Sequence, residues 1–246
     1  MVKAPAAEQR RLLDLQALDA KLKHLRSQSK ELAADPEIKS AQEMLSAEEQ
    51  DLVAARTAIE DIERELKRSD ADVETVRARI DRDQSRLDSG EGLSKDLLAL
   101  QKELETLTKR RNELEEVELE IMERLEITRA EEAKIVTRVE SLREKLGARE
   151  DERDAKQADI DASARALSDQ RQVLAGSFAD DLLAVYEKTL AQRGIGAARL
   201  FHGRSEGSGM DLSPGDLAEI NKAGEDAIVF CPDSGVILIR SEEWNS

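Results

Sequence analysis

The 246-residue sequence has few of the residues that usually fill a globular core. It contains only five aromatic residues, all after position 177, and eight of its twelve glycines follow residue 190. Because aromatic side chains carry much of the burial in ordinary cores, the first 177 residues are not an ordinary globular domain. Charged residues make up 37% of the chain, against roughly 25% in a typical domain. This composition leaves disorder and a long coiled coil as alternatives, between which periodicity must decide.

Other absences restrict the class of protein. The single cysteine, Cys231, excludes an internal disulfide and fits a reducing cytoplasm. No stretch reaches the ~18 consecutive apolar residues of a membrane span, and residues 1–11 lack the apolar centre of a signal peptide. A net charge of −16 argues against extensive electrostatic wrapping of nucleic acid or anionic membrane. We therefore expect a cytoplasmic protein that does not contact a membrane.

Apolar residues recur every seven positions in two long segments. The first series is Ile38, Leu45, Leu52, Ile59, Leu66, Val73, Ile80 and Leu87. The second is Leu93, Leu100, Leu107, Leu114, Ile121, Thr128, Ile135 and Leu142, and in it only Thr128 is polar. A seven-residue repeat sustained over this length predicts helices in a left-handed supercoil, and it decides against disorder.

The break between the two series predicts a hairpin. Ser89-Gly90-Glu91-Gly92 interrupts the helical pattern, and the flanking ranges 6–88 and 93–175 each number 83 residues. We predict helices over about 6–34, 38–88 and 93–175, with the tip at 89–92 and the coiled-coil hairpin ending at residue 176. Pro36 interrupts the first arm and would face the region of Gly147, so the antiparallel hairpin is expected to be kinked.

Residues 177–246 form a second, smaller domain in this prediction. A helix from Phe178 is ended by Gly194, short strands are expected over 197–201, 227–230 and 236–239, and a further helix starts at Ser213-Pro214. The predicted fold class is therefore mainly α, a long hairpin followed by a small α+β domain. So small a domain needs help from a metal or from docking onto the hairpin.

Four segments, in this order, carry a resemblance to a known family. They are Asp35-Pro36-Glu37-Ile38, the tip sequence from Lys95 to Glu103, Tyr186-Glu187, and the run from Cys231 to Leu238. Over essentially its full length the chain resembles the bacterial DUF164-like family of coiled-coil hairpins that end in a four-cysteine zinc ribbon. The resemblance implies zinc in the ribbon. It also implies partners among transcription or secretion components and, in some relatives, RNA.

The sequence departs from that family at the zinc ligands. The two CxxC positions of the ribbon fall on Ser205-Glu206-Gly207-Ser208 and Cys231-Pro232-Asp233-Ser234. Three of the four ligand positions, Ser205, Ser208 and Ser234, therefore carry neutral hydroxyls, which are poor zinc ligands. We expect a degenerate ribbon without zinc or another cofactor. Cys231 is then either an ordinary, half-buried residue or a reactive thiol.

The sequence supports binding better than catalysis. It contains no nucleophile–base pair, metal cluster or phosphate-binding loop that stands out from background. The predicted function is a non-enzymatic cytoplasmic adaptor or scaffold, which binds protein partners through the coiled coil and the ribbon-like head and is a monomer or a homodimer. The alternative is RNA or DNA binding through the head or the tip, where basic residues are enriched. The four basic tip residues named for this role, called the tip cations below, are Arg79, Arg82, Arg86 and Lys95.

Overall fold

Three long helices dominate the computed structural model, which describes residues 2–90, 92–240 and 244. They are α1 (Ala6–Ala33), α2 (Pro36–Ser89) and α3 (Ser94–Ala175). By their contacts the residues form two compact units, one made of residues 1–35 with 151–246 and the other of residues 36–150. In the part of the chain that is described, no helix is long and apolar enough to cross a membrane.

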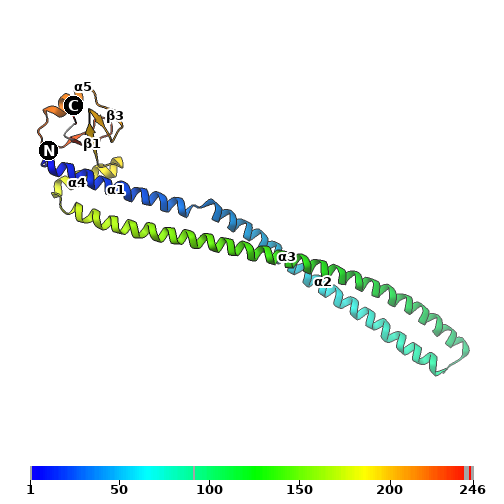
Figure 1. The fold of residues 1–246 in the computed structure, drawn as a ribbon. Helices are drawn as coiled ribbons and strands as arrows, with labels where there is room; N and C mark the ends of the chain where they lie inside the picture. Colours follow the sequence, from blue (N-terminus) through cyan, green and yellow to red (C-terminus); the bar gives the residue numbers. More distant parts are fainter. Residues whose placement is uncertain (1, 91, 241–243, 245–246) are drawn as a thin grey trace. The chain divides into compact units, whose positions relative to one another are not determined.

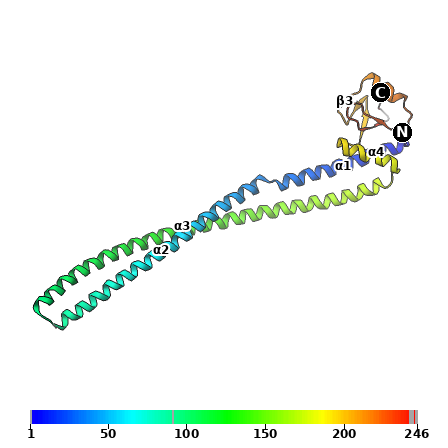
Figure 2. The ribbon, with the colours of Figure 1, turned by 180° about the vertical axis from the view of Figure 1, so that it is seen from behind.

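The unit of residues 36–150 is a helical hairpin. α2 and the first part of α3 lie side by side in both views (Figures 1 and 2). Along α2, none of the eight heptad positions from Ile38 to Leu87 is exposed. Ile62 packs against Ile121 and Leu125 of α3, so the predicted seams do form the contact between the helices. In the second heptad series, Leu93 is 75% exposed, because it lies in the turn before α3 begins.

The unit of residues 1–35 and 151–246 combines α1, the end of α3 and a small head. Its sheet has the strand order β3-β2-β1-β5-β4, in which β1 and β5 are parallel and the other neighbours antiparallel. The head consists of α4 (Asp180–Arg193), β1 (Ala197–Phe201), β2 (Arg204–Ser205), β3 (Met210–Asp211), α5 (Pro214–Lys222), β4 (Val229–Phe230) and β5 (Ile237–Arg240).

The sheet of the head has an apolar cluster on each face. Ile237 and Ile239 of β5 belong to one cluster, and the intervening Leu238 belongs to the other, as the two-residue period of a strand requires. The first cluster includes Leu12 and Leu15 of α1 together with Leu182 and Tyr186 of α4. The second includes Leu200, Leu212, Ile220 and Cys231. Packing on α1 therefore supplies burial that so small a head cannot supply alone.

Residues that precede α1 also join the head. Lys3 forms an isolated antiparallel bridge with Ala227, and the Ala4 N–H donates to the Asp226 carbonyl at 2.9 Å. The buried side chain of Gln9 donates from Nε2 to the carbonyls of Ala4 and Glu225, at 2.8 and 3.0 Å. Residues 3–9 are thus fixed to residues 225–227 by hydrogen bonds.

The predicted fold class, a mainly helical chain with a helical hairpin followed by a small domain containing strands, is confirmed. α1 ends at Ala33 and α2 starts at Pro36, whereas α3 passes through Gly147 without interruption. The structure adds β2 and β3, two-residue strands that were not predicted from the sequence.

Candidate functional site

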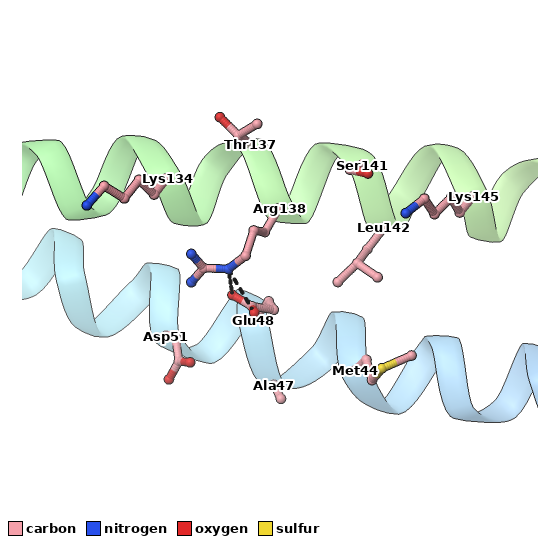
Figure 3. Close-up of a pocket in the computed structure, with 10 residues that line it drawn as sticks. All are labelled: Met44, Ala47, Glu48, Asp51, Lys134, Thr137, Arg138, Ser141, Leu142 and Lys145. Carbon is pink, nitrogen blue, oxygen red and sulfur yellow. Dashed lines mark hydrogen bonds and ion pairs between the residues drawn. The ribbon is translucent and has the colours of Figure 1, made fainter.

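One open groove lies between the two helices of the hairpin unit, and we call it the hairpin groove (Figure 3). Met44 and Leu142 supply apolar surface from opposite helices, and the Met44 side chain is 51% exposed. The full set of lining residues is Met44, Ala47, Glu48 and Asp51 of α2 with Lys134, Thr137, Arg138, Ser141, Leu142 and Lys145 of α3. Met44 lies outside both heptad series. An apolar residue at an outer position of the helix is therefore the feature of the sequence from which this surface could have been predicted.

Charges of both signs border the hairpin groove. The Arg138 guanidinium crosses it and donates from Nε to both carboxylate oxygens of Glu48, at 3.0 and 3.1 Å (Figure 3). The hydrogen bond with Glu48 raises the pKa of Arg138 above its usual range. This ion pair is well exposed, so its contribution to stability is small. Lys134, which is paired with Glu131 at 2.6 Å, Lys145 and Asp51 also lie around the apolar surface.

The tip cations of α2 share one face. Arg79, Arg82 and Arg86 are three and four residues apart, the spacing that brings side chains together on a helix. Arg79 binds the Glu103 carboxylate of α3 and lies 3.8 Å from that of Asp83. Arg82 donates to the Ala78 carbonyl at 3.1 Å. Arg86 and the fourth tip cation, Lys95 in the first turn of α3, are both exposed. Arg79 is thus paired with a carboxylate within the hairpin, and Arg86 and Lys95 are exposed to solvent.

Two turns of the head bring the degenerate ligand positions together. Cys231 is buried, and its Sγ lies 3.9 Å from Ser208 Oγ. Ser205 is completely buried, and neither its Oγ nor that of Ser234 has a hydrogen-bond partner among the described residues. Burial raises the pKa of the Cys231 thiol, but the nearby hydroxyl and backbone groups of Ser234 and the Ser205 hydroxyl lower it, and the net pKa lies below its ordinary value. We call this group of four residues the serine cradle.

A partly buried polar cluster that was not predicted from the sequence joins α1, α3 and α4. The Asp19 carboxylate accepts hydrogen bonds from Arg171, at 2.8 and 3.3 Å, and from the Tyr186 hydroxyl at 2.8 Å. Arg171 also donates to Glu187 at 2.5 Å. The Gln16 side-chain oxygen accepts from the Gly196 N–H at 2.6 Å. A Cβ at Gly196 would lie 2.3 Å from the Tyr186 ring, so this close approach requires glycine.

Comparisons with known proteins identify the family of this chain. The family model for the CT398-like coiled coil hairpin domain matches residues 15–194. A Mycobacterium tuberculosis (strain H37Rv) relative, named uncharacterized protein Rv2229c, is 35% identical over 241 residues, which cover 98% of either chain. The chain belongs to the CT398-like coiled-coil hairpin family. A second relative of this chain, uncharacterized protein ML1638 of Mycobacterium leprae, is 31% identical to it over 191 residues, which cover 76% of this chain and 81% of the relative.

Solved structures agree with this assignment. A structure from Mycobacterium smegmatis matches this CT398-like protein with a TM-score of 0.87 and 32% identity, covering 97% of this chain and all (100%) of that one. The structure of CT398 from Chlamydia trachomatis has a TM-score of 0.69 at 19% identity, with 96% and 98% of the two chains covered. The second likeness concerns the fold alone.

The resemblance to zinc ribbons can be tested on the donor atoms of this CT398-like protein. Structural zinc sites use four anionic or imidazole donors in a tetrahedron. The serine cradle offers one thiol and three neutral hydroxyls, and two of those hydroxyls are buried without a hydrogen-bond partner among the described residues. In the described part of the chain, no group of three or more His, Cys, Asp or Glu side chains is placed to hold a metal ion. The residues present do not fit zinc.

Proposed function

We propose that this CT398-like protein is a non-enzymatic cytoplasmic adaptor that binds protein partners through its helical hairpin and its head. The observation that carries the proposal is the hairpin groove, in which apolar side chains stay open to solvent between two otherwise charged helices. Scattered exposed apolar residues are ordinary, but a contiguous apolar groove with a polar rim is typical of an interaction site.

The shape of the hairpin groove favours a helical partner. Met44, Ala47 and Leu142 form an apolar strip that follows two adjacent helices. An amphipathic helix buries its apolar face in such a groove, and its flanking charges can meet the bordering lysines and carboxylates. Earlier in α3, Leu119 and Met122 are 59% and 43% exposed. A second groove between the helices includes Met122 and Leu66. Partner binding over several turns of the hairpin is therefore consistent with its surface.

The test is a groove variant with a matched control. M44E/A47E places two carboxylates in the hairpin groove, while V53E/T57E places two on another side of the same helix, and all four positions are exposed. Natural protein, groove variant and control are each used to capture partners from native cytoplasm, after circular dichroism shows equal helicity. We expect a partner that natural protein and control bind and that the groove variant binds at least about tenfold more weakly. Identical binding by all three proteins would refute the groove as the interaction site.

The second candidate function is nucleic-acid binding through the tip cations. It is favoured by the placement of three arginines on one face of α2 and by the exposed Lys95 in the first turn of α3. The overall charge of −16 opposes extensive binding, so any contact would be local, at the tip or at the head. Salt dependence separates this function from the adaptor function, because phosphate contacts release counterions whereas burial of an apolar face does not.

A further inference from the structure

The two turns of the serine cradle have the same backbone construction. In the first, the Gly209 N–H donates to the Ser205 carbonyl at 2.8 Å, and Gly209 has a φ of 70°. In the second, the Gly235 N–H donates to the Cys231 carbonyl at 2.8 Å, and Gly235 has a φ of 71°. Each turn is thus closed in the same way, four residues after its first cradle residue, by a glycine in the left-handed region.

The sheet holds both turns in place through backbone hydrogen bonds. Ser205 pairs with Leu200 and with Met210, which fixes the first turn between β2 and β3. Phe230 pairs with Ile237, and the Cys231 N–H donates to the Val236 carbonyl at 2.8 Å, which fixes the second turn between β4 and β5. The conformation of the turns is therefore set by backbone hydrogen bonds and by the apolar cluster beneath them.

The side chains of the cradle are poorly matched to one another. The buried hydroxyls of Ser205 and Ser234 lie near the Cys231 thiol, yet neither has a hydrogen-bond partner among the described residues. Buried polar atoms without partners destabilise a fold and are rare in native structures. The four cradle positions, two from each of two turns with the same backbone construction, have the C-x2-C spacing of the ligands in a four-coordinate zinc site. The backbone fits such a site although the donor atoms do not.

We propose that the head has the backbone of a four-thiolate zinc site but folds without metal, and that only the three serine hydroxyls prevent zinc binding. Replacing them by cysteines supplies the missing anionic donors, because a thiolate is the soft ligand that zinc prefers and serine differs from cysteine in a single atom. The natural chain holds no zinc, while the variant S205C/S208C/S234C, together with Cys231, binds one zinc ion in a tetrahedral site.

The experiment compares full-length proteins purified under reducing conditions. The natural chain, the triple variant and the control S46C/S85C/S168C, which adds cysteines at three separate exposed serines of the helices, are each incubated with zinc and passed over a desalting column. We expect about one zinc per chain in the triple variant and less than about one tenth in the other two. Cobalt substitution of the triple variant should give the visible absorption of a tetrahedral thiolate site.

Two results would overturn the proposal. One is a stoichiometric zinc ion in the natural protein. The other is zinc uptake by a folded triple variant that does not exceed the control, with folding judged by helicity and by Trp244 fluorescence.

A second variant keeps the proposal testable if the triple variant does not fold. S205A/S234A removes the two buried hydroxyls without adding thiols. If the cradle is held by its backbone, this variant unfolds at a urea concentration equal to or above that of the natural chain, because what the two hydroxyls lose among the described residues is at most a weak contact with the Cys231 thiol. A clearly lower midpoint would show that these hydroxyls hold the turns together, and it would refute the proposal.

Discussion

Tyr186 gives the sharpest test of how the head is fixed to the helices. Its side chain is fully buried, and its hydroxyl donates to the Asp19 carboxylate at 2.8 Å. Substitution Y186F keeps the ring and creates no cavity, so the change removes only the hydroxyl, with its hydrogen bond to the Asp19 carboxylate and a longer one, at 3.3 Å, to the Gln16 side-chain oxygen. A hydrogen bond to a charged acceptor contributes about 1.5–3 kcal/mol. Asp19 keeps its hydrogen bonds with Arg171, which places the expected loss in the lower part of that range.

Urea unfolding measures this loss. With a slope of about 2 kcal/mol per molar urea, the midpoint of Y186F should fall by about 1 M. Trp244 is partly buried against the second cluster of the head and reports on it by fluorescence, while circular dichroism follows the helices. The matched control is S27A, which removes an exposed hydroxyl that donates to the Glu31 carboxylate at 3.0 Å and should cost less than about 0.5 kcal/mol. Equal midpoints for Y186F and S27A would refute the assigned role of the polar cluster around Tyr186.

Three further predictions follow from groups described above. Burial and the hydrogen bond with Asp19 raise the pKa of Tyr186 well above 10. Above about pH 10 the unfolded chain therefore loses the phenolic proton first, and stability falls by up to about 1.4 kcal/mol per pH unit. This component should be absent from Y186F when urea midpoints are compared between about pH 9 and 11. Changing all four tip cations to glutamine should reduce the salt dependence of single-stranded RNA binding by roughly 0.7 per lost contact. Unchanged binding, or none at low salt in the natural protein, would exclude the tip as a nucleic-acid site. The Ser69 hydroxyl is buried on α2 without a hydrogen-bond partner among the described residues, so S69A should raise stability by about 1 kcal/mol in urea titrations, and a fall would show that the hydroxyl is bonded.

The hairpin could be predicted from sequence because its information is local and repeated. The heptad positions from Ile38 to Leu87 each indicate the same buried face, so errors at single positions do not matter. The strands β2 and β3 could not be predicted in this way. Each has two residues, and each exists because of its partner strand, as in the pairing of Ser205 with Leu200 and Met210. Two residues are too few to show a period.

Among the candidate sites, too, some could be predicted from the sequence and others could not. The resemblance to zinc ribbons indicated which residues belong to the cradle, and the structure brings Cys231 close to Ser208. The cluster around Tyr186 was not predicted, because Asp19 and Arg171 are 152 residues apart and meet only through the register of α1 and α3. The hairpin groove also depends on register, since Met44 and Leu142 come from opposite helices.

The contact of α1 with β5 has a consequence for how the chain folds during synthesis. Leu12 and Leu15 are covered in part by Ile237 and Ile239, which a ribosome adds more than 200 residues later. At about 5–20 residues per second, the apolar face of α1 stays uncovered for roughly 10–40 s. The hairpin between can form earlier from local contacts, and pairing of Glu37 with Arg149 at 2.8 Å then shortens the loop that remains to be closed. Until β5 is made, the nascent chain carries an exposed apolar helix, the state in which chaperone binding or aggregation would compete with folding.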